Sequence, residues 1–241
     1  PVSDTGKGNH SVFASTFIQA LRNNDNAISM GEIGMNIGYA HSHMNQMPIF
    51  PLKSIVLPGG IFPLRIFERR YLDMVRDCIK NDSNFCIALV RSESKSSYIN
   101  DVYSVASSVK IVDWNQLEDG ILGITVEGKN LVKIESCELN SKNLLTGNVE
   151  NIEQEKEYLI PEKYLLLSKF YKKIYPGIKN FIDYKKERYS DASWVGFRLT
   201  ECLPLDLSTK AGLISSDNAL ERLEKIHVII HKLYREELKV L

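Results

Sequence analysis

The sequence has few cysteines and no excess of charge of either sign. Its 241 residues include 4 cysteines, and 30 basic side chains balance 30 acidic ones. No two cysteines stand in a C-x-x-C pair, so the spacing typical of zinc and redox sites is absent and we expect reduced, structural thiols. The balanced charge argues against a surface that neutralises nucleic-acid phosphates. From these absences we expect no disulfide framework, no metal site and no cofactor.

Long apolar runs are also missing. No stretch approaches the roughly 18 to 20 apolar residues that span a bilayer. The first ten residues, PVSDTGKGNH, lack the basic-then-apolar order of a signal peptide. We therefore expect a cytoplasmic protein with no membrane partner. Because 44% of the residues are apolar and 25% are charged, the composition is that of an ordinary globular chain.

The residue pattern divides the chain into three stretches. Residues 1–46 are rich in Asn, Ser, Gly and Met, and we interpret them as a helical appendage and linker. Residues 47–152 carry short apolar runs separated by turn residues, with one helical pattern over 67–78. Residues 153–241 are helical in pattern. Since the strands follow one another without repeated helical crossovers, we predict an α+β fold, an antiparallel β-barrel followed by a helical bundle.

Residues 123–130 come closest to a phosphate-binding loop. They fit G-x-x-x-x-G-K, but Asn130 stands where the motif needs the Ser or Thr that binds magnesium. The flanking residues 124–126 and 131–134 have the pattern of strands, whereas the motif needs a helix after the loop. We therefore interpret residues 127–130 as a hairpin turn between two strands.

Two histidines stand four residues apart in the last helical pattern. His227 and His231 have a spacing that can hold a metal when both rings point into one pocket. A helical wheel puts both at the border between the apolar stripe and the charged face. No Glu follows His227, as the H-E-x-x-H motif requires. We interpret them as boundary histidines with one solvated nitrogen.

A helical pattern over residues 158–175 combines tyrosines with lysines. Such a strip can stack on single-stranded nucleic acid, or it can be an amphipathic helix whose tyrosines pack and whose lysines are solvated. The residues are Tyr158, Tyr164, Tyr171, Tyr175, Lys163, Lys169, Lys172 and Lys173. An RNA-binding function therefore stays open as the alternative.

The densest local pattern is PLKSIVLPGGIFPLRIFERRY over residues 51–71. Three prolines fix φ and the Gly59-Gly60 pair permits a tight turn, so we predict a strand, a rigid loop and the start of a helix. Arg65, Glu68 and Arg70 lie close enough in sequence to pair at that helix start. We interpret them as structural, because nothing in the sequence places a second carboxylate or a base beside Glu68.

This segment resembles, almost residue for residue, the opening of the LON substrate-binding domain at the N-terminus of Lon proteases. Residues 109–120 resemble that domain's strand and D-G turn, and 123–134 its following hairpin. Residues 191–205, with Lys210, Leu213 and Arg222, resemble its helical half. The resemblance covers residues 47–233. It implies a PUA-like β-barrel followed by helices, which together recognise substrate proteins for an attached ATPase and Ser-Lys peptidase.

The sequence carries no Walker motif and no peptidase domain, so it resembles the stand-alone LON-domain proteins. We therefore expect no enzymatic activity. The implied function is a non-catalytic protein-binding module, whose partners are unfolded or client proteins, or a protease or chaperone. The alternative is a PUA-like RNA-binding protein, which the zero net charge disfavours.

The predicted site residues fall into two groups, and none is catalytic, cofactor-binding or metal-binding. As partner-binding residues we predict Ile61, Phe62 and Arg65, because protein-binding patches expose apolar surface. The motif residues to which we assign structural roles are Pro51, Pro58, Gly59, Pro63, Arg65, Phe67, Glu68, Arg70, Tyr71, Asp119, Gly120, Gly128, Trp194, Arg198 and Pro204.

The first stretch carries a different resemblance. Residues 8–22 and 28–33 are similar to the last helices of bacterial caspase-like peptidases. The catalytic His and Cys of that family lie upstream of the similar region, so His10 has no matching role. We interpret residues 1–46 as a remnant of the tail of such a domain.

Overall fold

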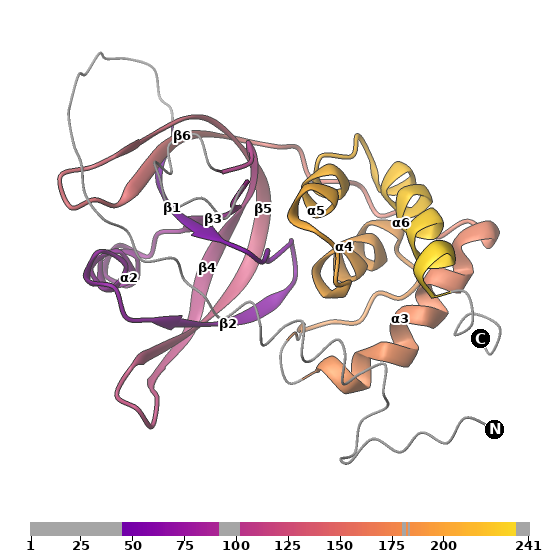
Figure 1. The fold of residues 1–241 in the computed structure, drawn as a ribbon, viewed down its shortest axis with the longest axis horizontal. Coiled ribbons are helices and arrows are strands. Elements are labelled where there is room, and N and C mark those ends of the chain that lie inside the picture. The colour runs from indigo at the N-terminus through magenta and orange to yellow at the C-terminus, as the bar shows by residue number, and fades with distance from the viewer. Residues whose placement is uncertain (1–44, 92–101, 180–181, 183, 235–241) are drawn as a thin grey trace. The chain divides into compact units, whose positions relative to one another are not determined.

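A computed structural model describes residues 45–91, 102–179, 182 and 184–234 (Figure 1). These residues form two compact units that divide between Gln154 and Glu155. The first unit, 45–154, holds all the strands, and the second, 155–234, is helical. In this part of the chain no helix is long and apolar enough to cross a membrane.

The first unit is built on one six-stranded sheet. Its strands are β1 (Asn45–Leu52), β2 (Ile61–Ile66), β3 (Phe85–Leu89), β4 (Val105–Gln116), β5 (Leu122–Leu139) and β6 (Leu145–Asn151). The order is β2-β5-β4-β3-β1-β6, and β6 pairs again with β5. Five strands therefore close into a barrel-like ring, with β2 added outside on β5.

Helix α2 (Arg69–Asn81) explains the one exception to antiparallel pairing. β1 and β3 pair parallel, while the other pairings are antiparallel. Parallel neighbours need a crossover connection, which β2 and α2 supply. The predicted α+β class and mainly antiparallel sheet are confirmed, and so is the predicted helix. Asp82 ends it in the left-handed conformation, at φ 49°.

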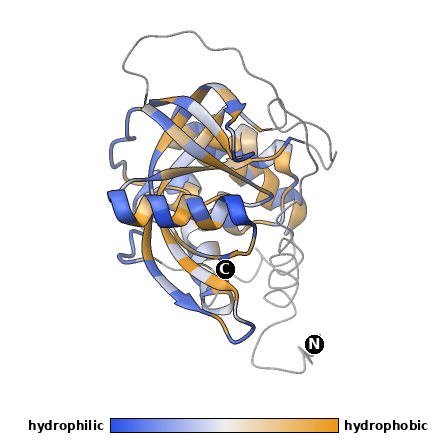
Figure 2. Cartoon of the chain, turned by 90° about the vertical axis from the view of Figure 1, so that its left-hand side faces the viewer, coloured by the Kyte–Doolittle hydropathy of each residue, from blue (hydrophilic) through white to orange (hydrophobic). Residues whose placement is uncertain are grey.

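One face of α2 packs against the sheet, and Figure 2 shows the helix lying across the front of the strands. Tyr71, Met74 and Val75 are buried together with Phe50 and Phe85 in one apolar cluster. The i, i+3 and i+4 spacing of these helix residues puts them on a single face, which is why the sequence forms a helix here.

The predicted hairpin turn at residues 127–130 is wrong, because β5 runs unbroken through it. Gly128 is required for close approach of two backbones. A Cβ on Gly128 would lie 2.2 Å from the carbonyl oxygen of Leu57. The Gly59 N–H donates to the Gly128 carbonyl, and the Gly128 N–H to the Gly60 carbonyl, each over 2.9 Å. A glycine inside a strand pattern marks such an approach as often as a turn.

The second unit contains a short 3₁₀ helix, η2 (Glu162–Tyr164), and four α-helices. They are α3 (Leu165–Ile178), α4 (Ala192–Cys202), α5 (Leu207–Ile214) and α6 (Ala219–Leu233). The side chains of Asp191, Asp206 and Asn218 accept backbone N–H bonds at the starts of α4, α5 and α6. Each helix therefore begins at a residue with a good capping side chain.

The predicted appendage lies outside the described residues, apart from Asn45 and Gln46. These two residues belong to β1, where they stand opposite Val149 and Asn148 of β6. The strand therefore begins two residues before the boundary that we drew at residue 47. The caspase-like resemblance of residues 1–46 stays a prediction.

Candidate functional site

Three strand segments extend from the ring as an arm, which we define as β2 with the residue that follows it (61–67), residues 110–116 of β4 and residues 122–127 of β5. Each β5 residue of the arm stands between one residue of β2 and one of β4; Ile124, for example, lies between Leu64 and Trp114. Strand β3 pairs with β4 only up to Val109. Within the described residues, β4 therefore has an open edge along 110–116.

The arm carries large apolar side chains at its surface. Trp114 is 55% exposed, Phe67 51% and Val112 39%. Residues directly opposite each other in a sheet share a face. Trp114 therefore stands on the face of Ile124 and Leu64, both of which are buried. The apolar core of the first unit thus continues through Trp114 to the solvent.

The open edge of β4 is partly blocked along its backbone. The pairing register with β5 shifts at Val112, which forms a bulge. The Trp114 N–H is bonded to the Asp113 carboxylate over 2.9 Å. Bulges and charged side chains at an edge discourage the addition of another strand. The arm therefore offers side chains, more than backbone groups, for contact with a partner.

Arg65 fixes the tip of the arm. Its guanidinium pairs with Asp119, in the turn that joins β4 to β5. Asp119 also accepts the Ile121 N–H at 3.2 Å, and Gly120 takes up the turn with φ 81°. The Ile121 N–H bond, followed by the Arg65 bond, lowers the pKa of Asp119. This D-G turn lies where the sequence predicts it.

The structure places the predicted partner-binding residues on β2. Ile61 and Phe62 are half-buried, and Phe62 packs against the core cluster. Arg65 is exposed, and its guanidinium forms an ion pair with Asp119. Our sequence analysis did not assign Trp114 and Val112 to the site. The signal was Trp114 in a strand pattern, separated only by Asp113 from the apolar, β-branched residues 109, 111 and 112.

Three other motif residues, Glu68, Arg70 and Tyr71, lie together at the start of α2. Arg70 is buried and donates to Glu68 over 2.5 Å and to the Asn143 carbonyl over 3.1 Å. Its guanidinium lies 4.7 Å from the centre of the Tyr71 ring. The predicted pairing of Glu68 with Arg70 is thereby confirmed, and it ties the start of α2 to the turn between β5 and β6.

Prolines and glycines in the motif have distinct local roles. Pro51 is buried within β1, while Pro63 is exposed in β2. Strand β2 pairs only with β5 in the described residues, so a residue without an N–H is tolerated there. Pro58 precedes Gly59, whose φ of 80° makes the turn that we predicted.

Trp194 and Arg198, two motif residues of the second unit, lie in its core, whereas Pro204 is exposed. Trp194 meets the rings of Tyr171, Tyr184 and Tyr189 edge-on, at 5.6, 4.7 and 5.2 Å. Arg198 lies 3.0 Å from Glu201, and both side chains are buried. Pro204 follows the extended Leu203, which ends α4.

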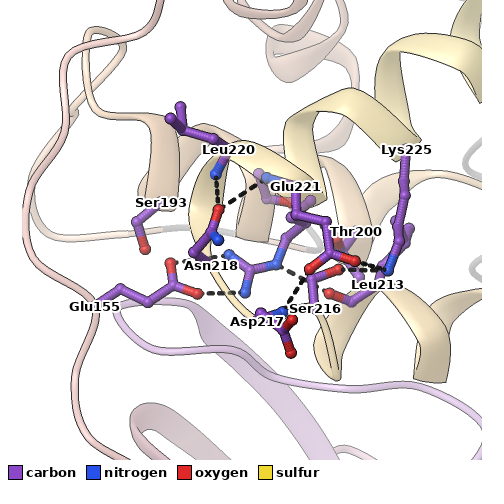
Figure 3. A network of polar contacts seen from close by, with 12 residues as sticks. Glu155, Ser193, Thr200, Leu213, Ser216, Asp217, Asn218, Leu220, Glu221 and Lys225 are labelled. Atoms are coloured by element: carbon purple, nitrogen blue, oxygen red, sulfur yellow. Dashed lines mark hydrogen bonds and ion pairs between the residues drawn. The ribbon is translucent and has the colours of Figure 1, made fainter.

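Glu155 and Arg222 form the centre of a polar network, shown in Figure 3. Glu155 accepts from both terminal nitrogens of the Arg222 guanidinium, over 3.0 and 2.5 Å. The Arg222 Nε–H donates to the Leu213 carbonyl at 3.0 Å. The same guanidinium lies 4.1 Å from the centre of the Phe197 ring. Arg222, fully buried, thus joins α4, α5, α6 and the segment that precedes η2.

The thiols of the described residues are poor nucleophiles. Burial raises the pKa of Cys86 and of Cys202 to about 12 each, and it also raises the pKa of Cys78 and Cys137. These thiols are therefore protonated at neutral pH. Nor do three or more His, Cys, Asp or Glu side chains gather as a metal-binding group in this part of the chain.

Comparison with known proteins agrees with this architecture. The sequence model of the ATP-dependent protease La (LON) substrate-binding domain matches residues 46–232. The first unit's ring and the helices that follow are thus those of a LON-type domain, and the chain belongs to the LON substrate-binding domain family. This confirms the resemblance that we found over residues 47–233.

Two solved structures have the same fold. The Lon N-terminal domain protein from Xanthomonas campestris is 28% identical, with a TM-score of 0.63 over 77% of this chain and 98% of that one. The N-terminal domain of the Mycobacterium avium complex Lon protease superposes with a TM-score of 0.52 at 17% identity, over 77% and 96% of the two chains. The second likeness concerns the fold alone.

Curated relatives are much longer than the matched region. The Lon protease of Buchnera aphidicola (subspecies Baizongia pistaciae) is 25% identical over 199 residues, which cover 77% of this chain and 24% of that protein. The Lon protease of Haemophilus influenzae is 24% identical over 199 residues, with the same coverage. The chain thus spans about a quarter of the length of these relatives.

Proposed function

We propose that this chain is a non-catalytic module that binds client proteins through the apolar side chains of the arm. The clients are unfolded proteins or protein segments that expose apolar residues. A protease or chaperone is the class of partner that would use such a module. The family membership supports recognition of proteins, and the arm supplies a surface for it.

The observation that carries the proposal is the exposure of Trp114 at an open strand edge. A tryptophan side chain contributes strongly to protein interfaces because it buries a large area with little loss of conformational freedom. Phe67 and Val112 of the same unit are also exposed. Burying these three side chains against a client removes apolar surface from water, which is favourable.

The experiment measures binding of fluorescein-labelled β-casein, an unfolded protein, by fluorescence anisotropy. We expect Trp114→Ser and Phe67→Ser each to weaken binding by about tenfold, which corresponds to about 1.4 kcal/mol. The matched control is Leu159→Ser, because Leu159 is an exposed leucine of the second unit, at 81%. The control variant should bind β-casein as the unchanged protein does.

Two results would contradict the proposal. Equal affinity of Trp114→Ser and the unchanged protein would remove the arm as the binding surface. A Leu159→Ser variant that is folded but binds as weakly as Trp114→Ser would also contradict it, because the loss would not be specific to the arm. Circular dichroism shows whether each variant is folded, since a folded variant keeps its spectrum.

The absence of catalysis is tested separately. The protonated thiols of Cys86 and Cys202 support it, because a cysteine nucleophile must be a thiolate. We expect no degradation of casein by the purified chain, with or without ATP and magnesium. Steady turnover that persists through repurification would contradict a non-catalytic role.

The RNA-binding alternative loses its main support in the described structure. Tyr164, Tyr171 and Tyr175 are buried, and Tyr158 alone of the four tyrosines is exposed. Buried rings cannot stack on bases. Salt-sensitive binding of single-stranded RNA by the purified chain would nevertheless favour this alternative over client binding.

A further inference from the structure

The imidazole rings of the two histidines of α6 lie against each other. The Nε2 atoms of His227 and His231 are 3.0 Å apart, and the two ring centroids are 4.3 Å apart. His231 is exposed, and His227 is half-buried, with its ring edge-on to Tyr164 at 5.6 Å. The two nitrogens therefore converge on one point at the surface of the second unit.

The separation of the nitrogens matches that of two ligands of one metal ion. Imidazole nitrogens lie about 2.05 Å from a bound metal, so two that subtend a right angle stand about 2.9 Å apart. Two that subtend a tetrahedral angle stand about 3.3 Å apart. The observed 3.0 Å is close to the right-angle value. Right angles between nitrogen ligands are typical of Cu²⁺ and Ni²⁺.

We propose that His227 and His231 form a two-nitrogen binding site for a divalent transition-metal ion, Cu²⁺ or Ni²⁺ in preference to Zn²⁺. The two ligands stand four residues apart on one face of α6, so little conformational freedom is lost when the ion binds. Water completes the coordination. The ion links successive turns of α6, and it therefore stabilises the helix.

The charges around the pair permit a cation to approach. Lys163 and Glu224 are the charged side chains that act on His227, with opposite effects. Burial, His231 and Lys163 lower the pKa of His227, which leaves its ring neutral at physiological pH. A neutral imidazole has the free lone pair that a metal needs. Lys163 weakens the attraction for a cation, and Glu224 offsets it.

The protons of the pair also balance. In the metal-free pair one Nε2–H donates to the other Nε2, because the two nitrogens are within hydrogen-bonding distance. When an ion binds, the donating ring carries its proton on Nδ1 instead. Both Nε2 lone pairs then face the ion, and no proton is lost from the neutral pair.

The test uses the full chain, with its other histidines removed. The chain has 5 histidines, so H10A/H41A/H43A leaves only the α6 pair. The matched control adds H231K/K232H to that protein, which keeps the composition but moves one ring to the next position on the helix. Positions 231 and 232 are both exposed, so the exchange leaves the core intact. Calorimetric titration with Cu²⁺, Ni²⁺ and Zn²⁺ measures binding, and the melting temperature is recorded with and without each ion.

We expect one Cu²⁺ or Ni²⁺ per chain in H10A/H41A/H43A, tighter than Zn²⁺, with a rise in melting temperature. The exchange H231K/K232H should weaken binding by at least about tenfold and abolish that rise. Undiminished binding by the exchange variant would overturn the proposal, and so would a lack of binding by H10A/H41A/H43A. Neither result depends on client binding by the arm.

Discussion

Glu155 and Arg222 meet across 67 residues of sequence in a two-pronged ion pair, with Arg222 fully buried. Breaking a buried pair by removing one partner leaves a charge without compensation in the protein interior. Arg222 also holds Leu213 and Phe197 in contact with α6. The pair therefore fixes the segment before η2 to three helices of the second unit.

We expect Glu155→Ala to destabilise the second unit by about 3 kcal/mol, because it leaves the Arg222 guanidinium buried and unpaired. Glu157→Ala is the matched control: Glu157 pairs with Arg188, and its side chain is 73% exposed. An exposed pair contributes only about 0–1 kcal/mol. Urea unfolding measures both variants. Equal stability of Glu155→Ala and Glu157→Ala would contradict the role of the buried pair.

Two glycines give opposite predictions for the same substitution. Gly128→Ala should destabilise the first unit by about 3 kcal/mol, since its Cβ would lie 2.2 Å from the Leu57 carbonyl oxygen. Gly212→Ala should stabilise α5 by about 0.5–1 kcal/mol, because no atom lies within 4 Å of the added Cβ. Thermal unfolding of the two variants measures the difference. A tolerated Gly128→Ala would show that loop 54–60 can move away from β5.

Stability at low pH should depend on Asp206. Bonds from Ser208, followed by those from Thr209, lower the pKa of Asp206 from 3.8 to about 2. A carboxylate with a lowered folded-state pKa contributes stability above its ordinary pKa, and that contribution is lost as the pH falls towards the lowered value. The loss therefore falls between about pH 4 and pH 2.

Asp206→Asn tests this dependence, because asparagine keeps the capping oxygen and cannot titrate. We expect a shallower decrease in unfolding free energy over this range in the variant than in the unchanged protein. Acid unfolding followed by circular dichroism measures it. Identical profiles would show that Asp206 has no lowered pKa in the folded chain.

The thiols should react slowly, and in a fixed order. Cys137 is half-buried, whereas Cys78, Cys86 and Cys202 are buried. With Ellman's reagent at pH 8 we expect Cys137 to react first and the other three to react only after unfolding in urea. The variant C137S should lack the early reaction. A fast reaction that persists in C137S would show that one of the buried thiols is accessible.

The sequence predicted those elements whose apolar period is regular. The buried face with Tyr71, Met74, Val75 and Cys78 underlies the helical pattern predicted over 67–78, and Asp82 ends α2 shortly after that range. The last helix likewise follows the stripe of Leu223, Ile226 and Ile230. In both cases a single buried face determines the element, so local information is sufficient.

Elements that depend on distant contacts were not predicted correctly. Strand β2 contains Pro63, which local rules place in a loop, and it forms only because β5 lies beside it. Gly128 was interpreted as a turn because its backbone partner, Leu57, is 71 residues away in sequence. The short helix α5, of 8 residues, had too few turns to show a period.

The surface of the arm was missed for the same kind of reason. Trp114 and Ile124 alternate in their strands as core residues do, and the sequence does not state where β3 stops pairing with β4. Trp114 is exposed because the pairing of β3 with β4 ends at Val109 and leaves residues 110–116 at an open edge. We instead predicted Ile61 and Phe62, because they are apolar and lie next to the glycine turn. In the structure they pair with β5 and are half-buried.

The closure of the ring has a consequence for the chain while it is being synthesised. Strand β1 pairs with β6, and β5 pairs with β2, β4 and β6. When the chain has left the ribosome only as far as β4, none of the pairings of β5 and β6 has formed, so the ring is still open. Until Leu145–Asn151 emerges, β1 and β5 lack β6 beside them, and such unpaired edges attract other chains. The nascent chain is thus itself a polypeptide with exposed apolar strands, and chaperones would meet it first in that state.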